Sequence, residues 1–539
     1  MKKYNLSVFI LVIFCSLFPA LLYSQVDTAW VRRYNGSGND YDYALAIVVD
    51  GQRNVYVTGY SVGSGTSDDY ATIKYNSAGV QQWVQRYNGP GNSDDNGVAI
   101  VVDGSGNVYV TGYSYGSGTS YDYATIKYNS AGVQQWVQRY DGSGNAEDRA
   151  CSIAVDGSGN VYVTGYSGLY PNYDYATIKY NSNGDTLWVR RYNGPGNGSD
   201  YPGSLAVDDS GNVYVTGSSG LYPNYDYATI KYNSNGDTLW VRRYNGPGNG
   251  EDDAYAMAVD GQGNVYVTGA SYGSGIGYMT IKYNSNGDTL WVRTHNRPGC
   301  AYAIAVDESG NVYVTGECYD SGTFWDYATI KYNSAGVQQW IQTYNGPGNG
   351  YDEACSISVD GQGNVYVTGW IAGLTTSDDY ATIKYNSAGA EQWVQTYNGP
   401  GNGWDRAHSI AVDSAGNVYV TGASIGSGTN VDYATIKYVQ TGAIEENRLP
   451  LSVDRFSLEI YPNPMKTLTD IRYSLPAESK VSLQLYDISG RLVKTLVNEQ
   501  KKQGDYSTPI NTQALSAGVY FLSLQTTSKR LIERLVIVK

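Results

Sequence analysis

One hexapeptide, NVYVTG, returns eight times along the 539-residue chain. The copies are 53, 53, 52, 52, 47, 53 and 53 residues apart and start at Asn54, Asn107, Asn160, Asn212, Asn264, Asn311, Asn364 and Asn417. A fixed period of this length indicates one supersecondary unit, copied many times, that buries a core only by stacking on its neighbours. Because near-identical copies place the same residues in every unit, the repeat predicts the architecture and singles out no catalytic centre.

Each repeat contains four short segments in which apolar and polar residues alternate. In the unit around Asp103 they are AIVVD (99–103), NVYVTG (107–112), DYATIKY (122–128) and QQWVQRY (134–140). Alternation of this kind between turns rich in Gly, Asn and Ser is typical of antiparallel strands. Since both faces of such a sheet carry apolar residues, each sheet must pack between two others, as the blades of a β-propeller do.

The order of the strands predicts how the array closes. Each of the four strand types occurs eight times, but the tryptophan-containing type comes first, as DTAWVRRYN (27–35), and the array ends at Tyr438 without one. An N-terminal strand that completes the last sheet would remove the exposed edges of a linear array. We therefore expect an all-β chain with an eight-bladed β-propeller over 25–438 that is closed by its N-terminal strand.

The two ends of the chain differ from the repeats. Residues 1–24 combine Lys2 and Lys3 with an apolar run over 8–22, which is typical of a secretory signal peptide and is short for a transmembrane helix. At the other end, 439–456 has the composition of a linker, and short alternating segments in 457–539 predict a small β-sandwich. The net charge of −14 argues against nucleic acid as a partner. We expect a monomer without a transmembrane segment.

Two stretches resemble known families. DGSGNVYVTGYS followed by DYATIKYN resembles the SBBP type of β-propeller repeat, over about 41–438. In the tail, YPNP (461–464), VSLQLYDISGRLVKTL (481–496), AGVYFLSLQ (517–525) and the basic KRLIERLVIVK together resemble the type A sorting domain of the type IX secretion system. That resemblance implies contact with the secretion machinery, passage through the outer membrane, and release or attachment at the cell surface.

An aspartate stands eight residues before the end of the first strand in seven of the eight units. If the first strands line a central channel, these carboxylates could form a ring that binds a hard cation such as calcium. Alternatively, each aspartate caps its own connection between units, and we favour this interpretation because a residue repeated in every unit usually serves that unit. The residues are Asp42, Asp95, Asp148, Asp200, Asp252, Asp352 and Asp405.

The sixth unit has Gly299 in place of this aspartate and carries two cysteines, Cys300 and Cys318. If Asp307 pairs with Asn311 across the hairpin, an unbroken antiparallel register places the cysteines directly opposite each other. Opposed residues have Cβ atoms near the separation that a disulfide needs. We predict a disulfide here, with two free thiols as the alternative if a bulge shifts the register.

Catalytic residues are sparse in this sequence. The two histidines, His295 and His408, lie in different units, and no cofactor is predicted. Trp325, Trp370 and Trp404 lie outside the tryptophan strands and could stack on sugars, but their positions point to no shared face. We expect a binding scaffold for a glycan or a protein rather than an enzyme. The alternative is a propeller enzyme of the lactonase, lyase or quinoprotein kind.

Overall fold

The computed structural model describes residues 25–441 except 273–276, 296 and 375. In the tail it describes 457–537 except 462–467, 476, 489, 512–514, 517 and 527–528. The predicted signal peptide (1–24) and residues 442–456 of the predicted linker lie outside the described residues. The chain divides after Thr441 into two compact units.

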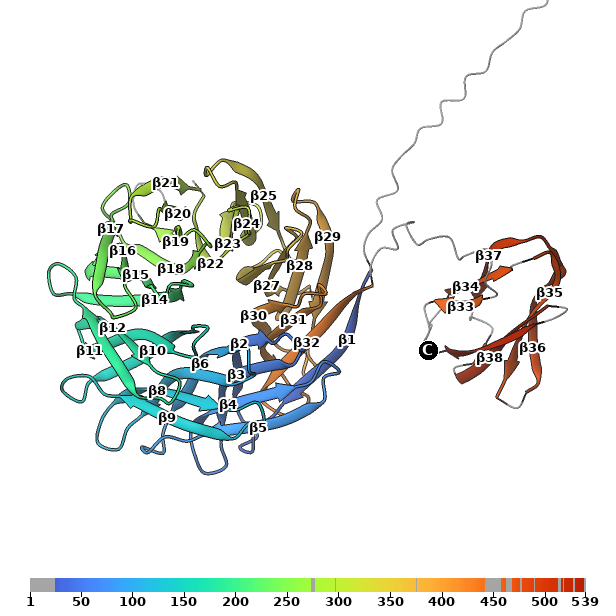
Figure 1. The fold of residues 1–539 in the computed structure, drawn as a ribbon, viewed down its shortest axis with the longest axis horizontal. Helices are drawn as coiled ribbons and strands as arrows, with labels where there is room; N and C mark the ends of the chain where they lie inside the picture. The colour runs from blue at the N-terminus through green and yellow to red at the C-terminus, as the bar shows by residue number, and fades with distance from the viewer. Residues whose placement is uncertain are drawn as a thin grey trace, which may run out of the picture. The chain divides into compact units, whose positions relative to one another are not determined.

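The first unit consists of antiparallel four-stranded sheets, which Figure 1 shows side by side around a ring. Sheets 1 to 4 are β2 (Asp42–Val49), β3 (Val55–Val62), β4 (Asp68–Tyr75), β5 (Gln81–Tyr87); β6 (Asp95–Val102), β7 (Val108–Tyr115), β8 (Tyr121–Tyr128), β9 (Gln134–Tyr140); β10 (Glu147–Val155), β11 (Val161–Leu169), β12 (Asn172–Tyr180), β13 (Thr186–Tyr192); and β14 (Ser199–Val207), β15 (Val213–Leu221), β16 (Asn224–Tyr232), β17 (Thr238–Tyr244).

Sheets 5 to 8 continue the same order of strands, and the last one takes its fourth strand from the start of the chain. They are β18 (Asp252–Val259), β19 (Val265–Ser271), β20 (Gly277–Tyr283), β21 (Thr289–Thr294); β22 (Gly299–Val306), β23 (Val312–Asp320), β24 (Phe324–Tyr332), β25 (Gln338–Tyr344); β26 (Glu353–Val359), β27 (Val365–Ala372), β28 (Asp378–Tyr385), β29 (Glu391–Tyr397); and β30 (Asp405–Val412), β31 (Val418–Ile425), β32 (Val431–Thr441) with β1 (Gln25–Tyr34). The predicted all-β propeller is confirmed.

Aspartate-centred turns fix the register of the first hairpin in each sheet. In sheet 2, Asp103 Oδ1 accepts hydrogen bonds from the backbone N–H groups of Ser105 and Asn107, and its Oδ2 accepts from Asn107 Nδ2 and the Tyr109 hydroxyl. These bonds hold Val102 opposite Val108. On the N-terminal side of each first strand, away from this turn, a β-bulge shifts the register by one residue.

Neighbouring sheets pack through an apolar core and are joined by hydrogen bonds that recur around the ring. Between sheets 1 and 2, Trp83 Nε1 and Lys74 Nζ donate to the carbonyl of Ser130 at 3.3 Å and 3.0 Å, and the Tyr70 hydroxyl donates to the carbonyl of Ala124 at 3.0 Å. The Trp83 ring packs on Gly132, whose φ is +84° and where a Cβ would lie 2.7 Å from the ring. Only glycine satisfies both constraints.

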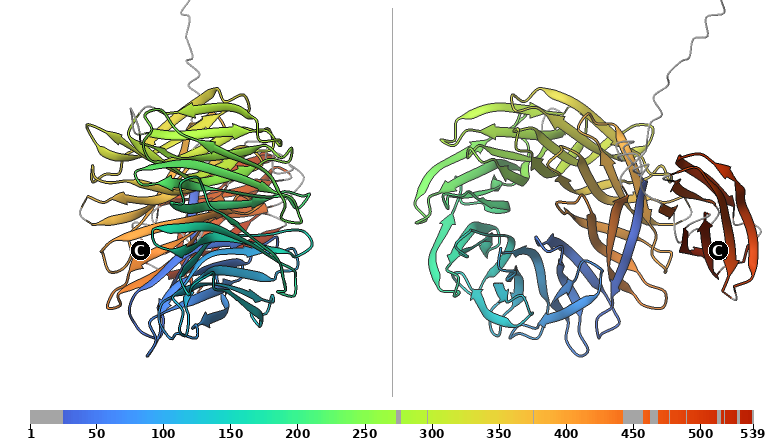
Figure 2. Two further views of the ribbon diagram at one scale, coloured as in Figure 1. Left: turned by 90° about the vertical axis from the view of Figure 1, so that its left-hand side faces the viewer. Right: turned by 45° about the vertical axis from the view of Figure 1, so that its right-hand side comes forward.

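The first and last sheets meet through the same set of contacts. β1 pairs with β32 from Gln25 opposite Thr441 to Tyr34 opposite Tyr433, so β32 continues three residues past the predicted end of the propeller. Trp30 Nε1 and Lys437 Nζ donate to the carbonyl of Ser77, as their counterparts do elsewhere. Figures 1 and 2 show β1 alongside β32.

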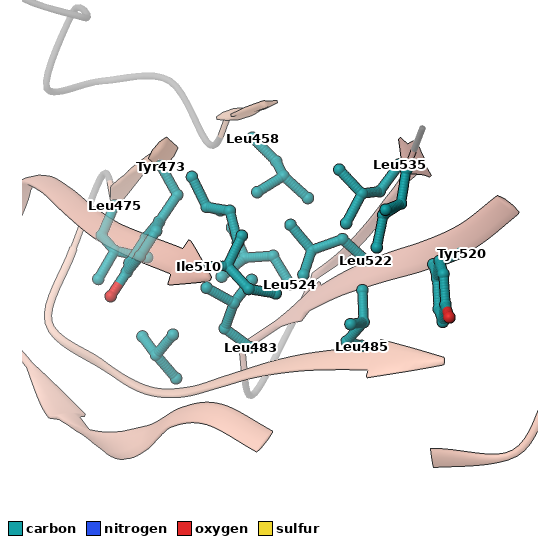
Figure 3. Packing of buried hydrophobic residues seen from close by; sticks show 13 residues of the cluster. Leu458, Tyr473, Leu475, Leu483, Leu485, Ile510, Tyr520, Leu522, Leu524 and Leu535 are labelled. Atoms are coloured by element: carbon teal, nitrogen blue, oxygen red, sulfur yellow. The ribbon is translucent and has the colours of Figure 1, made fainter. Parts of the chain in front are cut away.

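The second unit is a small β-sandwich. One sheet contains β33 (Ser457–Tyr461), β34 (Leu468–Leu475) and β37 (Gly504–Asn511), and the other contains β36 (Leu492–Lys501), β35 (Ser479–Asp487), β38 (Gly518–Gln525) and β39 (Arg530–Ile537). Alternate residues of both sheets meet in one core, which includes Leu475, Leu483 and Leu522, all fully buried (Figure 3). The predicted sandwich is therefore present.

Removing residues 27–35 tests the role of β1. The deletion leaves β32 with an unpaired edge and exposes part of the core beneath Trp30, which is 7% exposed. Loss of a buried tryptophan alone typically costs about 3 to 5 kcal/mol, so we expect a clearly lower melting temperature by calorimetry and a tendency to aggregate. Truncation after Thr441 is the control, since it leaves every propeller strand in place. A monodisperse deletion variant with the parental melting temperature would contradict closure by β1.

Candidate functional site

The propeller has two ends with different chemistry. One end, here called the turn end, holds the hairpin turns between first and second and between third and fourth strands, which are nearly the same in every sheet. The other, called the loop end, holds the connections between second and third strands and between sheets. Figure 1 shows first strands such as β6 and β22 toward the middle of the ring and fourth strands such as β9 toward the outside. Residues that distinguish one sheet from another gather at the loop end.

The seven repeated aspartates lie within the first two residues of a first strand or directly precede it, at the loop end, and each serves its own connection. Asp148 Oδ2, for example, accepts a hydrogen bond of 2.8 Å from the backbone N–H of Gly142, six residues earlier. The corresponding bonds of the other six measure 2.5 to 2.7 Å. All seven side chains are buried, at most 1% exposed. These bonds agree with the capping interpretation.

Burial also changes the acidity of these groups. It raises the pKa of Asp42, Asp148 and Asp352 to about 6, although hydrogen bonds to their carboxyl groups act in the opposite direction. Among the described residues, one group of three carboxylates brings ligand atoms within 4.8 Å of one another: Asp122, Asp141 and Asp148. Calcium binding by the repeated aspartates stays a prediction.

The structure corrects the predicted disulfide. Cys300 and Cys318 are both buried free thiols. The bulge between Ala301 and Ala303 shifts the register, so Cys318 lies opposite Gly299 and Cys300 lies opposite Glu317. Because neighbouring residues of a strand point to opposite faces, the two sulfur atoms lie on different sides of the sheet. Cys300 Sγ instead lies 3.1 Å from the hydroxyl of Tyr272.

Three tryptophans that the sequence left unconnected lie at the same end of the propeller, in sheets 6 to 8. Trp325 lies near the start of a third strand, Trp370 lies near the end of a second strand, and Trp404 directly precedes a first strand, so all three belong to the loop end. Tyr351 joins two of them: its ring stacks on Trp370 at 5.4 Å and 12° and lies 5.8 Å from the ring of Trp325. Beyond Trp325 the contacts continue to Tyr319 at 5.5 Å.

Arg406 connects this group to the third tryptophan. Its guanidinium lies 4.4 Å from the ring of Trp370 and 5.6 Å from that of Trp404. Trp404 in turn contacts Tyr43 at 5.8 Å, and Tyr43 stacks on Tyr60 at 5.0 Å. We call this continuous set the aromatic row; it consists of Tyr319, Trp325, Tyr351, Trp370, Arg406, Trp404, Tyr43 and Tyr60. It crosses sheets 6, 7, 8 and 1, and its rings range from Trp370 at 8% to Tyr351 at 41% exposed.

Two carboxylates adjoin the row. Glu317, at the end of β23, is 4% exposed and its Oε1 accepts a 3.0 Å hydrogen bond from the hydroxyl of Tyr302. Burial raises the pKa of Glu317, which also interacts with the phenol of Tyr351. Burial likewise raises the pKa of Glu353, at the start of β26, and the negative charge of Glu317 raises it further. No repeat motif marks either residue, and sequence reasoning missed both.

The histidines and the turn end show fewer features of a functional site. Burial lowers the pKa of His408 to about 4 and lowers that of His295, and the two lie in different sheets. A hollow of about 480 Å³ at the turn end, between sheets 2 and 3, is lined by residues such as Asp103, Lys127 and Ser182. Its polar groups already bond within the fold and recur in the other sheets, so it distinguishes no sheet as a site.

Family models match both units of the chain. Residues 459–538 match the secretion system C-terminal sorting domain, and residues 82–118, 135–168, 187–220, 239–277 and 392–428 match the SBBP beta-propeller repeat. The chain therefore carries SBBP β-propeller repeats followed by a type IX secretion sorting domain. The sorting domain directs the protein to the cell surface or to secretion and implies interaction with the secretion machinery. Within the described residues, no helix has the length and hydropathy to cross a membrane.

Several solved structures share the fold. They include PorZ, a surface component of the type-IX secretion system of Porphyromonas gingivalis (14% identity, 94% of this chain, 70% of that chain, TM-score 0.41). Sqt1 of Chaetomium thermophilum bound to the N-terminus of ribosomal protein L10 (9%, 76%, 99%, 0.48) and the polysaccharide lyase Uly1 (13%, 65%, 92%, 0.40) also match. Comparison with curated proteins gives no match. Similarity at this level does not extend to function.

Replacing one capping aspartate tests its protonation. In the folded state the pKa of Asp148 lies near 6, above its ordinary value of 3.8, so the stability contributed by this group falls as pH rises from about 4 to about 6. Asp148→Asn keeps the hydrogen bond to Gly142 without the charge. We expect it to be more stable than the parent at pH 7, by at most about 3 kcal/mol, and equal to it at pH 4.

Asp148→Ala is the matched control. It leaves the N–H of Gly142 without this acceptor, so it should be less stable than the parent at pH 4 by about 1 to 3 kcal/mol, and less stable than Asp148→Asn at both pH values. Denaturant unfolding at pH 4 and pH 7 measures all three proteins. An Asn variant that is less stable than the parent at pH 7 would show that the fold stabilises the charged carboxylate, which contradicts the raised pKa.

Thiol counting tests the corrected register. Unreduced protein, denatured and alkylated, should carry a label on both Cys300 and Cys318, since neither has a sulfur partner. Peptide mass spectrometry reads the result directly. A cross-linked pair of peptides containing these two residues would restore the disulfide and exclude the bulge.

Proposed function

We propose that the propeller is a non-catalytic binding module that holds a glycan along the aromatic row, and that the sorting domain delivers it to the outside of the cell. The observation that carries this proposal is the continuity of the row. Eight side chains from four sheets contact one another in sequence from Tyr319 to Tyr60.

The chemistry of the row suits a sugar chain. Aromatic rings offer flat apolar surfaces on which the C–H faces of sugars pack, and tyrosine adds a hydroxyl for hydrogen bonds. The rings are partly exposed and are held by strand ends, so their positions are set before a ligand arrives. Neighbouring carboxylates such as Glu353 supply acceptors for sugar hydroxyl groups.

Several observations favour binding over catalysis. Each of the seven repeated aspartates is engaged in capping, and His408 is buried with a pKa of about 4, which suits neither an acid nor a base near neutral pH. His295 lies in another sheet and is not placed to pair with it. An enzyme of the lactonase or lyase kind needs residues that converge on one reacting bond, and the described residues at this end form a row instead.

Truncating the row tests the proposed site. Trp404→Ala and Tyr351→Ala each interrupt it at a partly exposed ring. If each stacking contact contributes about 1 to 2 kcal/mol, affinity for the bound oligosaccharide should fall about fivefold to thirtyfold. A glycan array of neutral and charged oligosaccharides identifies the ligand, and isothermal titration calorimetry measures the variants.

Tyr222→Ala is the control, because it removes a ring that is 79% exposed at the loop end of sheet 4, outside the row. It should bind as the parent does. Equal affinity of all three variants would contradict the row as the site. If the parent binds an immobilised protein but no oligosaccharide, the ligand is a protein and not a glycan.

A further inference from the structure

Every arginine at the loop end that adjoins the first strands is already neutralised by a carboxylate. Arg149 pairs with Glu147 at 2.6 Å, Arg297 with Asp320 at 3.2 Å, and Arg406 with Asp378 at 2.6 Å. The eight lysines of the propeller all lie in the IKY segment of the third strands, near the turn end. In seven of the eight sheets their ammonium groups donate to the carbonyl of a serine in the neighbouring turn.

Carboxylates at the loop end outnumber these cations. A further set forms no ion pair with any described residue: Asp40, Asp68, Asp94, Glu251, Asp253, Glu317 and Glu353. Repulsion from neighbouring carboxylates raises the pKa of a carboxyl group, as Asp68 shows. Burial raises the pKa of Asp68 to about 6, and the charges of Asp94 and Asp69 act in the same direction.

Part of this excess lies beside the aromatic row. Five sheets carry an arginine on the fourth strand that pairs with an aspartate of the third, as Arg86 does with Asp69 at 2.8 Å. Sheets 5, 6 and 7 have Thr294, Thr343 and Thr396 at this position. These are the sheets that hold Asp253, Glu317 and Glu353, so the fold supplies negative charge there without its usual counter-charge.

We propose that the row binds a glycan whose sugars carry free amino groups, with an ammonium held beside Glu317 and Glu353. This inference rests on the proposed function and adds the charge of the ligand. An ammonium there would relieve the repulsion between the two carboxylates and lie next to the ring of Tyr351, which is 41% exposed. Arg406, between Trp370 and Trp404, shows that the row accommodates a cation against its rings.

Two oligosaccharides that differ only in charge test the proposal. The probes are the hexamer of β-1,4-linked glucosamine and the hexamer of β-1,4-linked N-acetylglucosamine, titrated into the full propeller at pH 6 and low salt. We expect the glucosamine hexamer to bind at least tenfold tighter. In Glu317→Gln/Glu353→Gln this preference should fall to within twofold, because the charged hexamer loses its advantage over the acetylated one.

Asp209→Asn/Glu308→Gln is the matched control, because it removes two exposed carboxylates at the turn end and changes the net charge equally. It should keep the tenfold preference, which separates a local site from general attraction to an acidic protein. Thermal melting confirms that both double variants fold. Equal binding of the two hexamers by the parent, or loss of the preference in the control, overturns the amino-sugar proposal and leaves glycan binding standing. Binding of neither hexamer, with binding of a lysine-rich peptide, overturns both.

Discussion

The contact between a tryptophan of one sheet and a glycine turn of the next is the joint on which the ring depends. Among the described residues of the propeller, no ladder of strand hydrogen bonds runs from one sheet to its neighbour, so packing and a few directed bonds must fix their relative position. Trp83 does both, because its ring covers Gly132 while its indole N–H donates to Ser130. Repetition of this joint explains why the turn sequences are nearly invariant around the ring.

The same joint leaves the opposite end free to vary. Connections between sheets at the loop end carry no tryptophan joint, and seven of the eight are stabilised from within by their own buried aspartate. Side chains there can differ from sheet to sheet without loosening the ring. The aromatic row and the neighbouring acidic residues lie at this variable end, so the structural role and the proposed ligand-binding role fall at opposite ends of one repeat.

Sequence reasoning succeeded where a residue acts through its own repeat and failed where residues from different repeats meet. The strand pattern and the capping role of residues such as Asp148 follow from periodicity and turn chemistry. The bulge that separates Cys300 from Cys318 leaves no mark in the local pattern of apolar residues, so the register beyond it could not be read. Antiparallel alternation did contain the signal that Trp325 and Trp404 share an end, since third strands start where first strands start. Their contacts through Tyr351 and Arg406 depend on packing between sheets.

The split origin of sheet 8 has an entropic consequence. Arg86 and Asp69 form their ion pair across 17 residues of chain, whereas the equivalent pair of Arg33 and Asp432 spans 399. Because loop-closure entropy grows with the logarithm of length, this adds about 3 kcal/mol to the cost of forming the last sheet. Trp393 faces sheet 8. Of the eight repeated tryptophans, it is the one whose indole N–H is buried without a hydrogen-bond partner among the described residues. Sheet 8 is therefore the seam of the ring, the last part to form and the first to open.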